Sequence, residues 1–401
     1  MRAYGLIAIL YKMADSVLSN TVDEVDNFDS MDLSEEILRG VYGIGFMVPS
    51  AIQKKGIMPI KNGRDILAQA QSGTGKTGTF TIGSLCRIDP ALKKVQVLVL
   101  VPVRELAQQI EHVVKDLSKY MGINIHSACG GSPLRDDIRV IEKGCQFLIG
   151  TPGRIYDLMN RNILLRDNIR VLILDEADQM LEDKFKEQVM CILEKGFPTT
   201  TQVALFSATM GADVREVADK MLQNPVKILI NPDEVPLDGI TQYYYCVDSE
   251  DWKIEVLADL YKQLTISQAI IYCNKRQRAE WLAEKMTALG FPLSCIHGEM
   301  DTNERKHRMS EFRKGAVRVL ISTDLLARGI DVQQISLVIN YELPTEMANY
   351  IHRIGRAGRF GRKGITINVV SKDEMKLLDE IKNHYNIILK ELPLNVASIM
   401  D

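Results

Sequence analysis

The sequence predicts an α/β protein with two parallel-sheet domains in tandem. Its 401 residues are enough for two domains of ordinary size. Short apolar runs alternate with amphipathic stretches of helical length, a pattern typical of a parallel sheet covered by helices on both faces. Residues 231–239 interrupt this alternation with two prolines, three acids and a glycine, which indicates a linker. We therefore expect a flexible tail at residues 1–24, a first domain at 25–230 and a second domain at 240–401.

Continuous apolar runs predict strands that are buried on both faces. In the first domain the expected strands are 66–70, 96–101, 147–150, 171–175, 203–207 and 226–230, with helices that include 79–87, 105–120 and 213–222. In the second domain the expected strands are 240–247, 269–273, 293–297, 317–322, 337–341 and 365–370, and the expected helices are 253–263, 278–289, 303–314, 347–356 and 373–386.

Composition excludes several classes of protein. Apolar residues make up 46% of the chain and charged residues 25%, so the chain is not of the disordered or low-complexity type. The formal net charge of −3 disfavours nucleic-acid binding through bulk positive charge and leaves room only for a local site. Seven single cysteines without a CxxC pair argue against structural zinc and for a reducing compartment. No apolar run reaches the length of a membrane span, and we expect a cytoplasmic protein, with the nucleus as the alternative.

Residues 70–77 read A-Q-S-G-T-G-K-T between an expected strand and an expected helix. Gly73 and Gly75 allow backbone N–H groups to surround a phosphate at a helix N-terminus, with Ser72 and Thr74 completing the loop. Lys76 can reach the β- and γ-phosphates of a nucleotide, and the Thr77 hydroxyl can ligate Mg²⁺. A chance glycine-rich turn is the alternative, and the strand–loop–helix context favours a site for ATP and Mg²⁺.

An apolar run at residues 171–175 ends in two carboxylates, Asp175 and Glu176. An Asp at this position can hold Mg²⁺ through water, and the adjacent Glu can orient and deprotonate an attacking water. The alternative is that these two acids have no function of this kind, because acidic residues that follow a strand are common on solvent-exposed loops. Together with the glycine-rich loop about a hundred residues earlier, this pair indicates a nucleotide site.

The acidic strand end continues as D-E-A-D at residues 175–178, and here the sequence resembles the DEAD-box ATP-dependent RNA helicases. Further motifs of that family follow in order over roughly residues 25–400. The resemblance implies two RecA-like domains joined by a short linker. It also implies that residues 45–53 form the adenine-reading motif, in which Phe46 can stack on a purine and Gln53 can pair with its edge.

The resemblance assigns further roles to residues that match the family's motifs. Arg353, Arg356 and Arg359 recur every third residue and suggest a local anion site. By resemblance, Arg356 and Arg359 are arginine fingers that reach the γ-phosphate from the second domain, Lys76 is a further catalytic residue, and Asp331 contacts the ribose. The RNA contacts that it implies are Pro102, Arg104, Gly131, Thr151, Gly153, Arg154, Arg305 and Thr323, and the residues that couple ATP to unwinding are Asp178, Ser207, Thr209 and His352.

Three departures from the family pattern concern RNA affinity rather than nucleotide chemistry. Val103 replaces a usual Thr, Thr302 replaces a usual Gln, and Lys184 replaces a customary Gly. We therefore expect the activity to be kept.

The expected function is RNA-stimulated ATP hydrolysis coupled to local, non-processive separation of RNA duplexes. The ending at residues 392–396 is most similar to members that serve translation initiation and to an exon-junction relative, and we expect the initiation role. Two alternatives stay open: an ATP-gated RNA clamp in an mRNA-bound complex, and a DNA helicase or translocase on the same core. The expected partners are single-stranded RNA, bound through its backbone with weak sequence preference, and a protein scaffold. We expect a monomer and no membrane.

Overall fold

The computed structural model describes residues 24–70, 73–181, 183–229, 240–264, 267–324, 335–357, 364–393 and 395–399. Residues 1–23 of the expected tail, the expected linker at 231–239 and three predicted site residues (Ser72, Asp331 and Arg359) lie outside the described residues, as do the side chains of Lys184 and Thr302. The described residues up to Leu229, apart from Gly73, belong to one compact unit, and those from Ile240 onward belong to a second. We call them unit 1 and unit 2 and describe each by itself.

Unit 1 contains a seven-stranded sheet in the order β3-β4-β2-β5-β6-β1-β7, and every strand pair is parallel. The central strands are continuous apolar runs that are buried along their whole length, as expected for a sheet covered on both faces. The strands are β1 (Ile66–Gln69), β2 (Val97–Leu100), β3 (Ile125–Ala128), β4 (Phe147–Gly150), β5 (Val171–Asp175), β6 (Gln202–Ser207) and β7 (Val226–Leu229).

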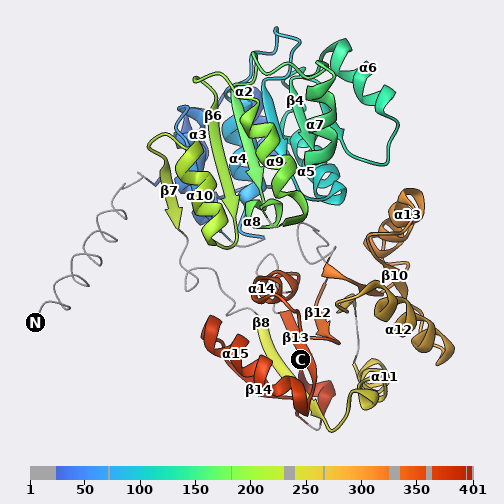
Figure 1. The fold of residues 1–401 in the computed structure, drawn as a ribbon. Helices are drawn as coiled ribbons and strands as arrows, with labels where there is room; N and C mark the ends of the chain where they lie inside the picture. The colour runs from blue at the N-terminus through green and yellow to red at the C-terminus, as the bar shows by residue number, and fades with distance from the viewer. Residues whose placement is uncertain are drawn as a thin grey trace, which may run out of the picture. The chain divides into compact units, whose positions relative to one another are not determined.

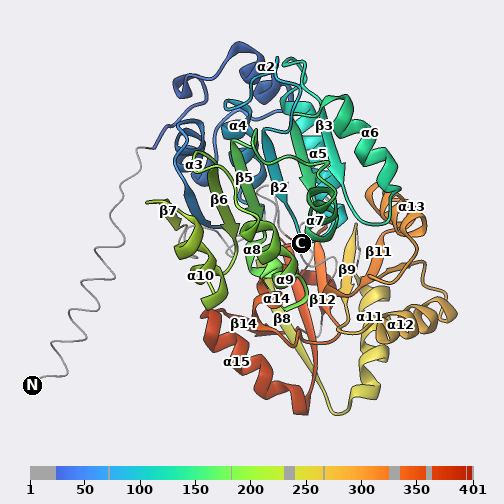
Figure 2. The same cartoon turned by 45° about the horizontal axis from the view of Figure 1, so that its top comes forward.

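Helices cover both faces of this sheet (Figure 1). One group packs α3 on α4, α4 on α5 and α2 on α5, and the other packs α9 on α7 and α8, and α8 on α10. The second group closes one buried cluster over the leucines and valines of the strands, and Figure 2 shows the two groups from a second direction. The helices are η1 (Asp29–Met31), α2 (Glu35–Gly43), α3 (Ala51–Lys61), α4 (Lys76–Leu85), α5 (Arg104–Leu117), α6 (Leu134–Gly144), α7 (Pro152–Asn160), α8 (Ala177–Met180), α9 (Asp183–Glu194) and α10 (Ala212–Met221).

Unit 2 repeats this architecture with a parallel sheet in the order β10-β11-β9-β12-β13-β8-β14. Alternate residues of β9 enter different clusters, with Ile271 facing α11 and α12 and Ile270 facing α13, so helices cover both faces. The strands are β8 (Ile240–Val247), β9 (Ala269–Tyr272), β10 (Ser294–Ile296), β11 (Val319–Ser322), β12 (Leu337–Asn340), β13 (Gly364–Ser371) and β14 (Leu389–Glu391).

The helices of unit 2 are η3 (Glu250–Trp252), α11 (Lys253–Gln263), α12 (Arg276–Ala288), α13 (Thr302–Arg313), α14 (Met347–Ile354), η5 (Lys372–Glu374), α15 (Met375–Tyr385) and η6 (Val396–Ile399). All seven cysteines of the chain are free thiols. Among the residues that the structure describes, no helix has the length and apolar character to cross a membrane.

The predicted fold class is confirmed, and two strands were missed. Both lie at sheet edges: β3 in unit 1 and β14 in unit 2. Their residues are half-buried or exposed for the most part, because an edge strand has a neighbour on one side only. Without a continuous apolar run, such strands give little signal in the sequence.

Candidate functional site

The glycine-rich loop leads from β1 into α4 with two residues in the left-handed region of backbone conformation. Gly73 has φ 87° and Gly75 has φ 102°, backbone angles that a residue with a β-carbon adopts only under strain. Gly75 is the N-cap of α4, which begins at Lys76. The first N–H groups of a helix have no acceptor within it, so the loop has the geometry to receive an anion.

The predicted adenine motif packs directly on this loop. A β-carbon on Gly75 would lie 2.6 Å from Ser50 Oγ, and one on Gly78 would lie 2.6 Å from Gln53 Nε2 and 2.9 Å from the Phe46 ring. Gln53 is buried, and its Oε1 accepts the Ser50 N–H at 2.8 Å in the first turn of α3. The structure thus brings Phe46 and Gln53 to the phosphate loop. Gly78 was not predicted, although it adjoins the loop motif in the sequence.

Lys76, Asp175 and Glu176 form a buried cluster of charges at the carboxyl ends of β1 and β5. Lys76 Nζ lies 3.2 Å from Glu176 Oε1 and 3.9 Å from Asp175 Oδ1, and the three residues are at most 5% exposed. Burial raises the pKa of Asp175 to about 7, although Lys76 acts in the opposite direction. Burial also acts to lower the pKa of Lys76, but the carboxylates of Glu176, Asp175 and Asp178 together outweigh it and raise that pKa.

Glu176 stands in a strained backbone conformation. Its φ of 56° places a residue with a β-carbon in the left-handed region, at a cost of about 1–2 kcal/mol. Its N–H donates to Asp175 Oδ1 at 3.0 Å, and the residue caps α8. Strain of this kind persists where the surroundings fix it and is concentrated at functional sites.

Asp178, the last acid of the D-E-A-D sequence, contacts the predicted coupling residues Ser207 and Thr209 at the carboxyl end of β6. Thr209 Oγ1 donates to Asp178 Oδ2 at 2.9 Å, and Ser207 Oγ accepts the Asp178 N–H at 3.2 Å. Ser207 Oγ in turn donates to the Thr209 carbonyl at 2.7 Å. Three of the four predicted coupling residues therefore form one hydrogen-bonded network next to the charged cluster.

The predicted RNA residues of unit 1 follow neighbouring strand ends, and one of them has an unpredicted partner. Arg154 forms an ion pair with Asp137, which is 2% exposed, and Arg154 Nη2 donates to the Ser132 carbonyl at 2.7 Å. His126 Nε2 lies 2.7 Å from the other oxygen of Asp137. The ion pair between Arg154 and Asp137 fixes the orientation of the Arg154 guanidinium. The sequence gives no signal for this ion pair. The other predicted residues follow β2, β3 and β4: Pro102, Arg104, Gly131, Thr151 and Gly153.

In unit 2, Arg353 lies in the protein interior, whereas the spacing of the arginines in the sequence suggested that it belongs to a local anion site. Its side chain is fully buried, and its guanidinium donates to both carboxylate oxygens of Asp324 at 2.5 and 2.9 Å. It also donates to Asn274 Oδ1 at 2.8 Å and to the Glu342 carbonyl at 2.7 Å. Arg353 therefore ties together the loops that follow β9, β11 and β12.

The remaining described candidates of unit 2 come from two helices and a strand end. Arg356 Nε donates to the His352 carbonyl at 3.1 Å, and both residues are almost fully buried. Arg305 on α13 is 7% exposed, with Nη1 3.4 Å from the Gly298 carbonyl. Thr323 follows β11 and is half-buried.

Comparisons with known proteins agree with this geometry. Residues 50–217 match the family described as DEAD/DEAH box helicase, and residues 252–361 match the helicase conserved C-terminal domain. Proteins named ATP-dependent RNA helicase eIF4A from Chaetomium globosum and Emericella nidulans are 51% and 50% identical to the chain, covering 95% and 98% of it and 96% and 98% of their own lengths. The structure of S. cerevisiae Dbp5 bound to RNA and ADP BeF3 is 36% identical, with a TM-score of 0.86, and the match covers 92% of this chain and 96% of that one. The chain therefore belongs to the DEAD/DEAH box helicases.

Proposed function

We propose that the chain hydrolyses ATP in response to RNA and uses this reaction to separate short stretches of RNA duplex. The observation that carries the proposal is the buried cluster of Lys76, Asp175 and Glu176 at the end of a glycine-rich loop. A buried lysine beside a glycine-rich loop and two carboxylates supplies the parts that phosphoryl transfer needs: charge neutralisation, a metal ligand and an orienter of water.

The adenine base and the phosphates of ATP would bind to adjoining parts of unit 1. The Phe46 ring and the Gln53 amide lie against Gly78, one turn into the helix that receives the phosphates. This placement suits a purine that stacks on the ring and uses the amide for its polar edge. Gln53 Oε1 already accepts one N–H from Ser50, and its NH₂ group and second lone pair are the groups proposed for the base.

The residues fit a magnesium ion. Asp175 offers a carboxylate at the strand end, and Thr77 offers a hydroxyl in the first turn of α4. Oxygen donors of this kind suit Mg²⁺, which keeps several waters and binds substrate phosphates as well. When bound, the ion would neutralise charge that develops on the phosphates. Ionised Asp175 is the form that binds a cation, and a nearby divalent charge favours that form.

Glu176 is the proposed orienter and base for the attacking water. Lys76 Nζ lies 3.2 Å from its carboxylate, so the lysine holds the carboxylate in place and would also face the phosphates. Arg356 and Arg359 are proposed to stabilise the charge of the transition state, a contribution of about 10³–10⁵ in rate for such arginines. His352 would hold Arg356, whose Nε donates to its carbonyl.

RNA is the proposed partner, bound through its sugar–phosphate backbone. The candidates include guanidinium groups, hydroxyls and backbone amides (Arg104, Arg154, Thr151 and Gly131), which recognise phosphate and ribose with little discrimination between bases. The Dbp5 structure that this fold matches is bound to RNA. The name eIF4A of the relatives supports a role in translation initiation. We propose that this role lies in the cytoplasm and involves a protein scaffold.

The test is a duplex-separation assay with matched RNA and DNA substrates, with and without ATP. The chain should separate a short RNA duplex in the presence of ATP, and Glu176→Gln should abolish turnover. Glu216→Gln, which alters a surface pair with Lys220 on α10, is the matched control and should behave like the parent. Equal activity on both duplexes would favour the DNA translocase, and full activity of Glu176→Gln would overturn the assignment of that residue.

A further inference from the structure

The two sheets can be compared residue by residue, because their strand orders correspond position for position. In unit 1, β2 pairs with β5 so that Val97 lies opposite Val171, and in unit 2 β9 pairs with β12 so that Ala269 lies opposite Leu337. Val171 and Leu337 are therefore equivalent. Glu342 follows Leu337 by the same five residues by which Glu176 follows Val171.

The same comparison identifies the counterpart of the phosphate-loop lysine. Phe206 pairs with Ala68 in unit 1, and the equivalent residue of β13 pairs with Tyr245 in unit 2. Lys76 follows Ala68 by eight residues, and Lys253 follows Tyr245 by eight residues. Each lysine is the first residue of its helix, α4 or α11. Unit 2 thus carries a lysine and a glutamate at the places of Lys76 and Glu176.

The loop before Lys253 cannot surround a phosphate as the loop of unit 1 can. Glu250 and Trp252 stand at the places of the two glycines, and together with Asp251 they form the 3₁₀ helix η3. The Trp252 N–H donates to the Ser249 carbonyl at 3.2 Å, and the Asp251 N–H donates to Ser249 Oγ at 3.4 Å. The donors that an anion would need are thus used inside the loop, and two acids have been added.

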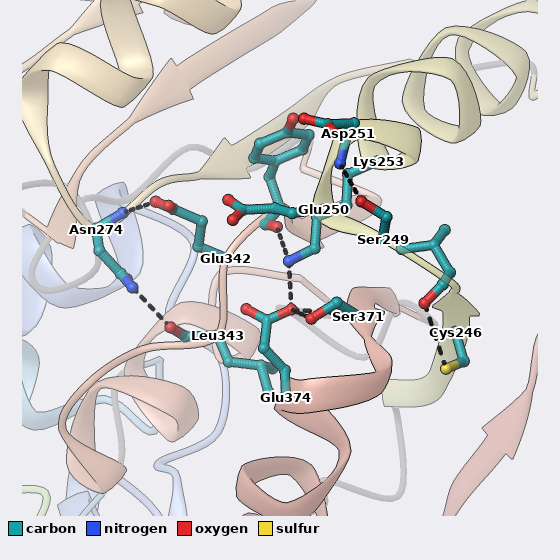
Figure 3. A network of polar contacts seen from close by, with 12 residues as sticks. Cys246, Ser249, Glu250, Asp251, Lys253, Asn274, Glu342, Leu343, Ser371 and Glu374 are labelled. Carbon is teal, nitrogen blue, oxygen red and sulfur yellow. Dashed lines mark hydrogen bonds and ion pairs between the residues drawn. The ribbon is translucent and has the colours of Figure 1, made fainter.

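Lys253 nevertheless remains, and it is fully buried (Figure 3). Its ammonium donates to the Tyr341 carbonyl at 3.2 Å and forms an ion pair with Glu374 Oε2. The same Glu374 oxygen accepts the Ser371 N–H at 2.8 Å and the Ser371 hydroxyl at 3.2 Å. One carboxylate oxygen therefore receives a lysine ammonium, a backbone amide and a hydroxyl, the three kinds of donor that bind a phosphate oxygen in a nucleotide loop.

Glu342, the counterpart of Glu176, does not form the ion pair with Lys253. Its Oε2 accepts the Asn274 N–H at 2.7 Å (Figure 3). Its Oε1 lies 3.7 Å from Arg278 Nε. In unit 1 the lysine contacts the glutamate at the end of the central strand, whereas in unit 2 that glutamate is held by other groups. The negative charge opposite Lys253 comes instead from Glu374, a residue 121 positions away in the sequence.

We propose that the Glu374 carboxylate is a built-in substitute for a nucleotide phosphate: it neutralises Lys253 and closes in unit 2 the position that unit 1 keeps for ATP. The proposal rests on Lys76 as the phosphate-binding lysine, but its consequences concern the stability of unit 2 and can be measured without ATP hydrolysis.

The chain provides its own reporter for this test. It has two tryptophans, and both lie in unit 2: Trp252 precedes Lys253, and Trp281 stacks on Arg278 with 4.6 Å from the guanidinium carbon to the ring centre. Thermal unfolding of the full chain followed by tryptophan fluorescence therefore reports unit 2. The probe is sulfate, a tetrahedral anion, with chloride at equal ionic strength as the reference, because sulfate also stabilises folded proteins in general.

Glu374→Ala should lower the unfolding midpoint by about 6–12 °C, since it leaves a buried ammonium without its counter-ion. Sulfate should restore at least half of this loss. The parent and Asp373→Ala, an exposed acid in the same turn, should gain only the small general effect of the salt. The double variant Lys253→Met with Glu374→Ala should not respond beyond that level. An equal sulfate effect in all four chains, or a response that persists without Lys253, overturns the proposal.

A second variant covers the case in which Glu374→Ala does not fold. Glu374→Gln keeps the volume of the side chain and an oxygen for the Ser371 bonds, but it removes the charge. It should unfold at a lower temperature than the parent and gain nothing specific from sulfate, because the amide still fills the position. A glutamine variant as stable as the parent would show that no anion is needed opposite Lys253 and would overturn the proposal.

Discussion

Replacing Arg353 by lysine should destabilise unit 2 strongly, although the substitution keeps the charge. Arg353 is fully buried, and its guanidinium donates to Asp324, to Asn274 Oδ1 and to the Glu342 carbonyl. It also lies over the Tyr272 ring, 5.2 Å from its centre. A lysine can keep one ion pair with the carboxylate, but it lacks the planar fork that reaches three loops at once.

The size of the effect follows from the bonds that are lost. A hydrogen bond that involves a charged group contributes about 1.5–3 kcal/mol, and lysine would lose at least two of them while a carbonyl and an amide oxygen lose their donors. We expect a loss of about 3–6 kcal/mol, a large part of the ~5–15 kcal/mol that stabilises a typical domain. With a urea m-value of about 2 kcal/mol/M, the midpoint in urea should fall by about 1.5–3 M.

The assay is urea unfolding followed by tryptophan fluorescence, which reports unit 2 because both tryptophans lie there. Arg276→Lys is the matched control: that side chain is 40% exposed and pairs with Glu280 and Glu299 on the surface, where ion pairs contribute about 0–1 kcal/mol. An Arg353→Lys chain whose midpoint equals that of the control would refute the reasoning, since Arg353 would then not hold the three loops together.

Three further predictions concern the nucleotide site, the coupling network and the buried thiols. Gly78→Ala should raise the KM for ATP about tenfold or more, because its β-carbon would lie 2.6 Å from the Gln53 amide; ATP titration of the hydrolysis rate measures this. Thr209→Val removes the donor to Asp178 and should lower the rate of duplex separation more than the rate of ATP hydrolysis. Measuring both rates on one preparation tests this. The chain should lose stability above about pH 9, because burial raises the pKa of Cys86 from 9.0 to about 11. A thiol with a raised pKa adds stability that is complete below its ordinary pKa and is lost as the pH rises through the folded value. Because Cys86 lies in unit 1 and both tryptophans lie in unit 2, urea midpoints from far-ultraviolet circular dichroism at pH 7.5, 9 and 10 check this.

Each of these has a control or an opposing outcome. Gly211 has no neighbouring atom within 4 Å of a built β-carbon, so Gly211→Ala should leave the KM unchanged; an equal effect in both alanine variants would contradict the steric argument. Parallel losses of hydrolysis and separation in Thr209→Val would show that the network serves catalysis rather than coupling. Urea midpoints that stay constant from pH 7.5 to 10 would show that thiol burial is not coupled to stability.

The strands of the interior and the phosphate loop could be predicted because their signals are local. A strand such as β5 is an unbroken apolar run, and the glycines of the loop adjoin the lysine that they serve. The edge strand β3 escaped because its Ile-His-Ser-Ala sequence is half-polar. Local signals thus identify strands with a clear apolar pattern, including the edge strands β7 and β10, and miss those without one.

The pairing of charged groups could not be predicted, because it depends on residues that are distant in the sequence. Arg353 and Arg356 give the same pattern in the sequence, yet the partners of Arg353 are 29 and 79 positions away. The ion pair of Arg154 with Asp137 and that of Lys253 with Glu374 likewise depend on which strand ends adjoin. Strand order and register determine these contacts, and neither can be predicted from one segment of the sequence alone.

The central claim is that RNA controls ATP hydrolysis at the cluster of Lys76, Asp175 and Glu176. The most direct test is the steady-state hydrolysis rate of the full chain at saturating Mg²⁺ and ATP, measured with and without single-stranded RNA. Enzymes whose catalytic site is completed by a conformational step are slow until their ligand is bound, so RNA should raise the rate by about tenfold or more. The same rate with and without RNA would contradict the account.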